Sequence, residues 1–556
     1  MIEDDLRTWL RSGLEAAAAG LGLNGDLPEP EVMEPRQKGH GDFATNVALA
    51  VAGRVGLAPR QVAEAITASL PAVPFVRSVE VAGPGFINVF LTQGWLHDVL
   101  RRIAEEGDAF GSTARNGVRV QVEFVSANPT GPLHVGHARN AVLGDAIARL
   151  LDATGYDVER EYYYNDAGGQ MDRFGASVEA AYLSILGRLT PIPEDGYHGA
   201  YIQELGRELA GASPGWAELA DGERFATIRR AAAERVLGWI DESLARFHVR
   251  FDSYVSEADL AAKGEIGEAI ERLRDGHHAY EADGAVWFRS TDFGDDKDRV
   301  VVRSNGTHTY FGADCAYLIH KFSRGFDRVL YVWGADHHGD VVRVRGAAQA
   351  LGYDPGAVEM VIYQWVSFLR GGEPVAMSKR AGTFVSLDEL IEEVGTDAAR
   401  FHLLLSGSDH TTRFDIDEVK RRSMENPVYY VQYGHARIAS ILRKAEEMGT
   451  SLRSIDHVDL GLLVDPAEVD LLKALADVPS TIATAAELRA PHRIVHASQD
   501  VAARFHRFYT ECRVMSEDAE LTQARLWLCR GSKIVLARLL GLVGVSAPER
   551  MDRGDG

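Results

Sequence analysis

The pattern of hydrophobic and polar positions divides the chain into three regions. In the middle region, stretches typical of strands at 118–125, 158–164, 329–333 and 358–366 alternate with helical stretches, including a long one at about 135–154. Such alternation is typical of a parallel sheet that is covered on both faces. We therefore predict a Rossmann-like α/β domain over residues 112–410, with a mainly helical, charged insertion at about 166–283.

The two flanking regions follow other patterns. Residues 1–111 combine an Ala- and Leu-rich helix near Leu6–Ala19 with turn-rich sequence and a strand near its end, which predicts a small α+β domain. The polar, Gly-rich stretch at 108–116 is expected to be a linker. From about Asp397 the strand signal disappears, and Ala, Leu and Arg repeat with helical spacing. Residues 411–556 are predicted to form an all-α bundle.

Composition narrows the class of protein. The chain has 556 residues, of which 46% are hydrophobic and 25% are charged, as in an ordinary globular protein of several domains. No stretch approaches the ~20 apolar residues of a membrane helix, and the N-terminus is acidic where a secretory signal would be basic. We expect a cytoplasmic protein without a membrane partner. The net charge of −22 argues against indiscriminate nucleic-acid binding, although local basic clusters could still contact RNA.

The cysteines indicate neither zinc nor disulfides. Cys315, Cys512 and Cys529 form no C-x-x-C pair, so we expect buried apolar side chains and no structural metal.

Two glycine-rich motifs lack the context that their usual functions need. Gly20, Gly22 and Gly25 match a dinucleotide-binding pattern, but they follow a predicted helix instead of a strand. The stretch 211–215 matches a nucleophile elbow, but Pro214 follows the serine and has no N–H to hold an oxyanion. Neither motif is taken as a site.

The strongest local signal is the stretch 126–137, which ends in a histidine, valine, glycine, histidine motif. It follows the 118–125 strand and opens a helix, so it lies where open α/β sheets bind ligands. A helix N-terminus offers unpaired N–H groups to a phosphate, and Gly136 leaves room for a flat base. The motif alone could equally cap a helix or bind a metal. The candidate ATP-binding residues here are Pro129, Thr130, Gly131, His134, Gly136 and His137.

A second motif, 376–380, reads Ala-Met-Ser-Lys-Arg in a Gly-rich loop after the last predicted strand of the middle region. Adjacent cationic groups on such a loop can neutralise charge on the α-phosphate and the departing pyrophosphate. By itself the loop would be a solvated basic turn. Together, the two motifs indicate nucleotidyl transfer.

The two motifs resemble the HIGH and KMSKS signatures of class I aminoacyl-tRNA synthetases, and the whole chain resembles the arginyl-tRNA synthetase family. The second motif departs from the signature at Ala376, where lysine is usual. The resemblance implies catalytic roles for His134, His137 and Lys379 and further ATP contacts from Met377, Ser378 and Lys379. It also implies ATP as a substrate with Mg²⁺, and no metal ligands from the chain.

A guanidinium substrate needs carboxylates, because it carries five N–H donors and a permanent charge. Glu123 and Asp314 are the candidate acids, and Tyr310 precedes Asp314 by one helical turn. Single acids of this kind are often merely structural. The resemblance assigns to arginine binding the residues Glu123, Ser126, Asn128, Tyr310, Asp314 and His337.

The start of the terminal helical region carries aromatic and basic side chains that could stack on unpaired RNA bases. An aromatic stripe at helical spacing is by itself more often core. The resemblance to the family's anticodon-binding domain favours tRNA contact, and the N-terminal domain resembles the one that touches the tRNA elbow. The predicted tRNA-binding residues are Asn426, Tyr430, Gln432, Tyr433 and Arg437.

The resemblance implies an arginine–tRNA ligase that uses L-arginine, ATP and tRNA(Arg) and that we expect to be a monomer. Three alternatives remain open at this stage. They are a class I synthetase for glutamate or cysteine, a small nucleotidyltransferase with the same histidine motif, and a tRNA-binding relative without activity.

Overall fold

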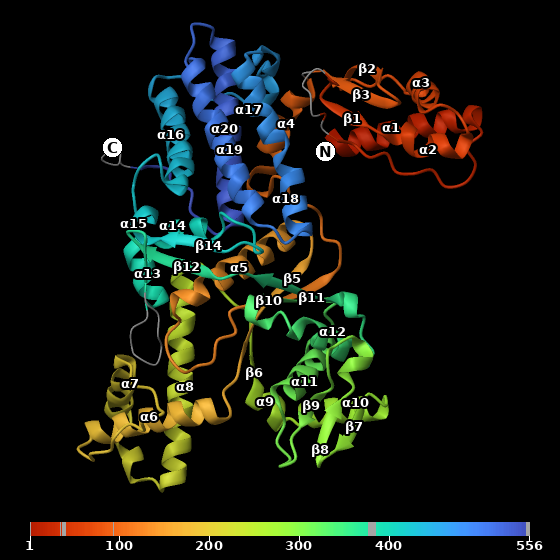
Figure 1. Cartoon of the computed structure of the whole chain (residues 1–556). Helices are drawn as coiled ribbons and strands as arrows, with labels where there is room; N and C mark the ends of the chain where they lie inside the picture. The colour runs from red at the N-terminus through yellow and green to blue at the C-terminus, as the bar shows by residue number, and fades with distance from the viewer. Residues whose placement is uncertain (1, 34, 36–39, 93, 376–384, 552–556) are drawn as a thin grey trace. The chain divides into compact units, whose positions relative to one another are not determined.

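The computed structural model describes residues 2–33, 35, 40–92, 94–375 and 385–551. These residues form two compact units (Figure 1). One comprises 1–110, 437–480 and 500–535, and the other comprises 111–436, 481–499 and 536–556. No helix among the described residues is long and apolar enough to span a membrane.

The second unit contains a five-stranded parallel sheet with the strand order β11-β10-β4-β5-β6. Its strands are β4 (Arg119–Glu123), β5 (Asp157–Tyr164), β6 (Ser253–Ser256), β10 (Arg328–Gly334) and β11 (Val358–Tyr363). The chain runs from β4 outward through β5 and β6, then returns to β10 on the other side of β4. This reversal makes a switch point at the carboxyl ends of β4 and β10, where α/β sheets bind ligands.

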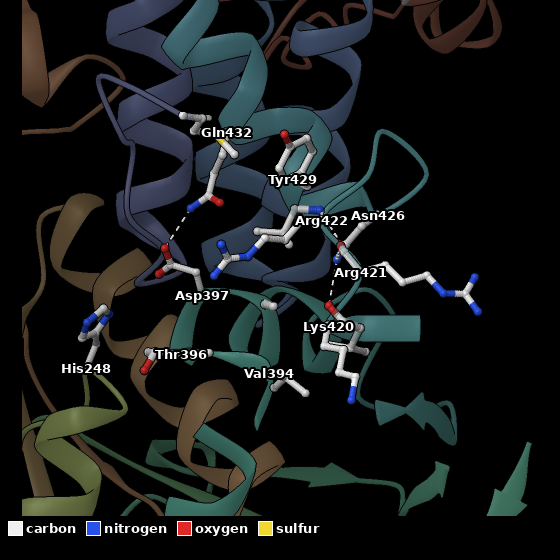
Figure 2. Close-up of a pocket in the computed structure, with 15 residues that line it drawn as sticks. His248, Val394, Thr396, Asp397, Lys420, Arg421, Arg422, Asn426, Tyr429 and Gln432 are labelled. Carbon is white, nitrogen blue, oxygen red and sulfur yellow. Dashed lines mark hydrogen bonds between the residues drawn. The ribbon is translucent and has the colours of Figure 1, made fainter. Parts of the chain in front are cut away.

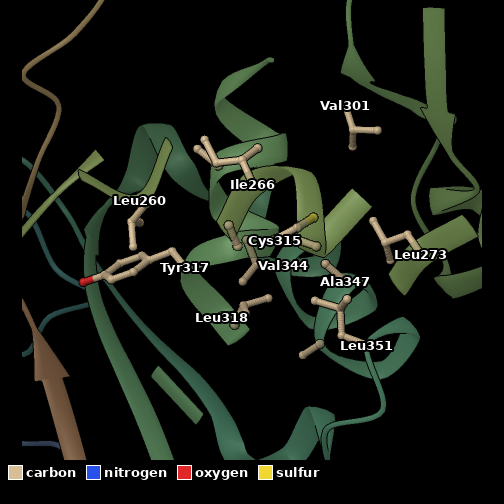
Figure 3. Close-up of a cluster of buried hydrophobic side chains, with 14 of the residues drawn as sticks. Leu260, Ile266, Leu273, Val301, Cys315, Tyr317, Leu318, Val344, Ala347 and Leu351 are labelled. Atoms are coloured by element: carbon tan, nitrogen blue, oxygen red, sulfur yellow. The ribbon is translucent and has the colours of Figure 1, made fainter. Parts of the chain in front are cut away.

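Helices cover both faces of this sheet, as predicted. Helix α5 (Ala138–Ala153) contacts β4, β5 and β10. On the other face, α10 (Glu265–Asp275), α11 (Tyr310–Ser323) and α12 (Asp340–Ala350) pack into one apolar cluster with alternate residues of β10 (Figure 3). Burial on both faces explains the apolar run in β10, whereas β4 and β5 also carry the buried polar residues Gln121, Glu123 and Glu161.

The predicted insertion is largely helical but contributes one strand to the sheet. It contains α6 (Gly169–Ile185), α7 (Ala200–Ala212) and α8 (Asp221–Arg246), and then β6 joins the edge of the sheet beside β5. Helix α9 (Glu257–Ala262) and a separate three-stranded sheet, β7 (Ala279–Ala282), β8 (Ala285–Phe288) and β9 (Arg299–Val302), precede α11.

The prediction that strands end near Asp397 is wrong. Strand β14 (Thr412–Asp415) pairs in parallel with β12 (Val366–Arg370), which also pairs with β13 (Glu373–Pro374). Four residues are too few to show a period in the sequence, and the strand exists because β12 supplies its hydrogen bonds. Helices α13 (Leu387–Val394), α14 (Thr396–Leu403) and α15 (Ile416–Val419) adjoin this sheet.

The terminal region is helical, as predicted, with α16 (Pro427–Glu447), α17 (Pro466–Ala476), α18 (Val478–Glu487), α19 (His492–Glu511) and α20 (Ala519–Leu542). At the other end of the chain, β1 (Phe43–Thr45), β3 (Phe86–Leu91) and β2 (Val76–Ala82) form an antiparallel sheet. Helices α1 (Ile2–Leu21), α2 (Val47–Val55) and α3 (Pro59–Ser69) pack on this sheet, and α4 (Gly94–Glu106) follows it. The α+β prediction is confirmed. All three cysteines are buried, as predicted.

Candidate functional site

The turn after β4 is conformationally strained. Val125 and Ser126 both have positive φ, at 66° and 45°, which costs about 1–3 kcal/mol each for residues other than glycine. Asn140 of α5 holds the turn, because its Oδ1 accepts from the Val125 N–H at 2.6 Å while its Nδ2 donates to the Val332 carbonyl of β10 at 2.9 Å. The strain turns the Ser126 hydroxyl back onto Glu123, at 3.1 Å from its Oε1.

The histidine motif forms a single turn that precedes α5. His134 is its N-cap, and the His134 Nδ1 accepts from the Gly136 N–H at 3.0 Å. The His137 Nδ1 accepts from the His134 N–H at 3.3 Å, and the two rings lie 4.0 Å apart between centroids. A Cβ on Gly136 would lie 2.6 Å from the His134 Cε1. A side chain at position 136 would therefore force the His134 ring to shift from its place beside His137.

The chain that follows the second signature pairs with the histidine turn. Met377, Ser378 and Lys379 lie outside the described residues, as does Ala376. The chain that follows them is described, and it pairs with the histidine turn. The Val135 N–H donates to the Val385 carbonyl at 3.0 Å, and the Leu387 N–H donates to the Leu133 carbonyl at 2.9 Å. The described chain thus resumes at Val385 beside the first motif.

Acidic side chains gather at the carboxyl end of β4. Glu123 is the last residue of β4 and is buried. Asp314 lies one turn into α11. Among the described residues, none is recorded in a hydrogen bond or an ion pair with its carboxyl group. Burial raises the pKa of Asp314 to about 8, with further increases from Glu123, Glu257 and Asp340 and a smaller opposing effect from Arg343. A carboxyl group in such surroundings lacks a cation.

Tyr310 is the first residue of α11, which confirms that it and Asp314 share a helix. Its side chain is 67% exposed, at the N-terminal end of α11. His337 follows β10, and its ring nitrogens lie 3.1 Å from Asp340 and 3.6 Å from Asp336. Tyr310 and His337 are thus accessible side chains at the carboxyl edge of the sheet and the start of α11.

Asn128 to Gly131 are held by the helical insertion. The Asn128 side chain donates to Gln170 at 2.8 Å and accepts from the Asn165 N–H at 3.1 Å. The Thr130 carbonyl accepts from the Tyr201 hydroxyl at 2.9 Å, and a Cβ on Gly131 would lie 2.9 Å from the Tyr201 ring. Pro129 lies in the same fixed segment. The insertion therefore shapes one wall of the predicted nucleotide site.

The predicted tRNA-binding residues differ in how accessible they are. Asn426 and Gln432 are buried, and their amides are used within the fold. The Asn426 Nδ2 donates to the Val419 and Arg421 carbonyls, and the Gln432 Nε2 donates to Asp397 at 2.8 Å. Tyr430, Tyr433 and Arg437 are half-buried, and the Arg437 guanidinium lies 4.2 Å from the Tyr509 ring.

A cavity of about 770 Å³ adjoins Asn426 and Gln432 (Figure 2). Helices α14 and α16 and the 419–422 segment line it. The Arg422 side chain extends into the cavity in Figure 2, whereas that of Arg421 points away. The described residues place no ion-pair partner on either arginine that the structure records. The lining of the cavity combines the cationic residues Lys420, Arg421 and Arg422 with Asp397 and with apolar residues such as Val394 and Val428.

Sequence reasoning missed three residues that organise the site, namely Asn140, Glu257 and Lys321. Each acts on a residue far away along the chain, so no local motif contains it. The one available signal was Lys321, a lysine near the apolar residues Leu318, Ile319 and Phe322. Among the described residues, no cluster of three or more His, Cys, Asp or Glu side chains has the arrangement of a metal site.

The parallel sheet, the strained β4 turn and the paired signatures define a class I aminoacyl-tRNA synthetase. A protein-family model described as "tRNA synthetases class I (R), catalytic domain" matches residues 99–188 and 217–424. The model for the arginyl tRNA synthetase N terminal domain matches residues 5–91, and that for the DALR anticodon binding domain matches 431–551. The chain belongs to the arginyl-tRNA synthetase family.

Individual relatives support the same family. An arginine–tRNA ligase from Moorella thermoacetica is 50% identical over 539 residues, which cover 96% of each chain. One from Heliobacterium modesticaldum is 48% identical over 97% of each chain. The solved Thermus thermophilus arginyl-tRNA synthetase matches with a TM-score of 0.77 over 99% of this chain and all of its own, and at 24% identity that likeness shows the fold. Membership in this family excludes the glutamate, cysteine and small nucleotidyltransferase alternatives.

Proposed function

We propose that this chain activates L-arginine with ATP to form arginyl-adenylate and transfers the arginyl group to the 3′-terminal ribose of tRNA(Arg), releasing AMP and pyrophosphate. We further propose that Glu123 and Asp314 hold the guanidinium of the substrate. The observation that supports this most is Asp314, a carboxyl group without a recorded partner among the described residues and surrounded by other acids. A guanidinium would neutralise it with charge-assisted hydrogen bonds.

Ser126, Asn128, Tyr310 and His337 are proposed to complete the arginine site. Ser126 is already fixed against Glu123, and Asn128 is fixed by the insertion. These two would orient the α-amino and carboxyl ends of arginine. Tyr310 and His337 would cover its side chain from the exposed edge.

In the first step, an oxygen of the arginine carboxylate attacks the α-phosphorus of ATP, and the bond from that phosphorus to the bridging oxygen breaks to release pyrophosphate. His134, His137 and Lys379 would stabilise the charge that develops on the phosphoryl oxygens. Pro129, Thr130, Gly131, Gly136, Met377 and Ser378 would hold the nucleotide. Since little covalent chemistry falls to the protein, positioning contributes most of the rate.

In the second step, a hydroxyl of the terminal ribose attacks the arginyl carbonyl carbon, and AMP leaves. We propose that tRNA is held by Tyr430, Tyr433 and Arg437 through their accessible faces. Asn426 and Gln432 are buried and their amides are used within the fold, so we propose that they support the wall of the cavity that Arg422 enters and do not contact tRNA themselves.

Mg²⁺ is proposed to enter with the triphosphate as part of the substrate, with no ligand from the chain. A monomer in the cytoplasm is also proposed. Sedimentation of the purified protein would test the first of these two, and fractionation of cells would test the second.

The function is tested by ATP–pyrophosphate exchange in the presence of tRNA, measured with each protein amino acid in turn. We expect exchange with arginine alone. Exchange with another amino acid would refute the arginine assignment. The lack of exchange with every amino acid would instead support the inactive tRNA-binding alternative.

We also expect activation to depend on tRNA, because the family often requires it. The expected result is that pyrophosphate exchange with arginine and ATP is close to background until tRNA is added. Full exchange activity without tRNA would refute this prediction.

Arginine binding should release a proton below pH 8. The pKa of Asp314 in the free enzyme is about 8, so at pH 6.5 its carboxyl group is protonated and must ionise to hold a guanidinium. Titration calorimetry in two buffers of different ionisation enthalpy measures the released protons. We expect about one proton per arginine at pH 6.5 and a value near zero at pH 9. Equal proton release at both pH values would contradict the role of Asp314.

A further inference from the structure

Lys321 is a fully buried lysine that the proposed reaction does not explain. It lies in α11, two turns after Asp314, and its side chain has no exposed surface. Its ammonium group donates to the Gln121 Oε1 at 2.6 Å, the Glu123 Oε2 at 2.9 Å and the Glu161 Oε1 at 3.2 Å. An ammonium has three donors, so these three bonds use all of them.

Aromatic rings complete the surroundings of the ammonium. Its nitrogen lies 3.9 Å from the Tyr317 ring centroid and 4.6 Å from that of Tyr331. Figure 3 shows that the Tyr317 hydroxyl points out of the apolar cluster, and this hydroxyl donates to Glu161. The Lys321 ammonium is therefore enclosed by three acceptors and two aromatic rings, and none of its N–H donors is left for another partner.

Glu161 ties Lys321 to a second cation. Burial alone would raise the pKa of Glu161, but Lys321, the Tyr317 hydroxyl and Arg324 lower it to about 2. Arg324 also pairs with Glu159. Glu161 therefore remains charged, and the Lys321 ammonium is shared between Glu123 and Glu161.

The two carboxylate oxygens of Glu123 have different hydrogen-bond partners. Lys321 occupies Oε2, and the Ser126 hydroxyl contacts Oε1 from the strained turn. A carboxylate has about four acceptor positions, so the remaining ones on Oε1 are left for a ligand. Two contacts from different elements fix the plane of the carboxylate.

We propose that Lys321 is a positioning residue for the choice of arginine, which fixes the orientation of the Glu123 carboxylate with Oε1 presented to the substrate guanidinium. This inference rests on the proposed function of Glu123. A purely structural role for Lys321 is a poor explanation of this ion pair. Buried ion pairs contribute little net stability, and apolar residues can often replace a whole pair without loss. A positioning role is separable from folding by its effect on arginine alone.

Lys321→Met tests the proposal by comparing the KM for arginine with the KM for ATP in pyrophosphate exchange with tRNA. We expect the arginine KM to rise about 20-fold, since a charge-assisted hydrogen bond to the guanidinium weakens, while the ATP KM stays within about twofold. Inhibition by citrulline, which is neutral and has nearly the shape of arginine, should change much less. The selectivity for arginine over citrulline should therefore fall about 10-fold.

The comparison with citrulline supplies a second measurement that a structural role would not change. Misfolding would weaken the binding of arginine and of citrulline alike, whereas a misplaced Glu123 carboxylate weakens only the binding of the charged ligand. Equal weakening of both would overturn the proposal.

A double variant guards against failure to fold. Lys321→Met with Glu161→Gln removes one positive and one negative charge together, so it leaves less uncompensated charge, and we expect the same change in arginine KM and in selectivity over citrulline. Arg224→Met is the control, since Arg224 pairs with Glu179 between α8 and α6 and touches no pocket residue named above. Arg224→Met should leave both KM values within about twofold.

Glu123→Gln separates this inference from the proposed function. If Glu123→Gln raises the arginine KM but Lys321→Met and the double variant do not, Lys321 has no positioning role and the proposed function stands. If Glu123→Gln leaves the arginine KM unchanged, the guanidinium is not held by Glu123 and both fail.

Discussion

Asp314→Asn is expected to lower kcat/KM for arginine about 1,000-fold, the loss that follows when one partner of a buried charge pair is removed. The asparagine has nearly the same shape but no charge for the guanidinium. The KM for ATP should change little, since Asp314 lies in α11 and not in the nucleotide turn. Pyrophosphate exchange with tRNA measures both constants. A fall of less than about 10-fold would show that Asp314 is not an arginine ligand.

The same substitution should stabilise the free protein. The folded-state pKa of Asp314 is raised to about 8, so the unfolded chain loses this proton at lower pH than the folded chain does. Stability conferred by the neutral form is complete below the unfolded pKa and is lost as pH rises to about 8. The gain in melting temperature from Asp314→Asn should therefore be small at pH 5, grow up to pH 8 and then level off.

Asp283→Asn is the matched control, because Asp283 is exposed in the turn between β7 and β8. It should change neither activity nor the pH dependence of melting. If Asp314→Asn lost activity without gaining stability at pH 8, its effect would come from disturbed packing and not from the removed charge. Loss of activity with gain of stability is the combination expected of a residue kept for binding.

The sequence predicted the parallel sheet because strand-forming and helix-forming stretches alternate along it. Strand β10 is a nearly continuous apolar run, whereas β4 alternates valines with the polar residues Gln121 and Glu123, and both patterns predict strands. The short strands β6 and β14 gave no such signal. Each has four residues, and its partner strand decides whether it pairs at all. Periodicity cannot be measured over four positions.

The histidine turn was predictable because its interactions are local in the sequence. His134, Gly136 and His137 act on one another within one turn, so their spacing alone carries the geometry. Their placement beside Val385 was not visible, because that contact joins residues far apart in the chain.

The arginine pocket could be predicted only in part. Glu123 and Asp314 were found because a cationic substrate demands acids near the signature. Their supports were not found, since Lys321 reaches Gln121 across 200 residues and Glu257 arrives from another element. A local reading of residue types also could not show that Asn426 and Gln432 are buried and use their amides inside the fold.

Gly136→Ala should reduce kcat for arginine activation about 100-fold and leave the arginine KM nearly unchanged, because it moves a group that acts on the phosphate and not on the guanidinium. The added Cβ would lie 2.6 Å from the His134 Cε1 and 2.7 Å from its Nδ1. These distances are impossible for non-bonded atoms, so the ring must turn away. It then loses the bond from the Gly136 N–H and its place beside His137.

Gly267→Ala in α10 is the control, since a Cβ there meets nothing within 4 Å. It should leave kcat within about twofold, as expected of a surface substitution. Single-turnover measurement of adenylate formation separates chemistry from product release and so shows which step has slowed. If Gly136→Ala raised the arginine KM as much as it lowered kcat, the turn would be shaping the amino-acid pocket. An unchanged kcat would mean that the position of the His134 ring does not matter for the attack on the α-phosphorus, and the catalytic assignment of the histidine turn would be wrong.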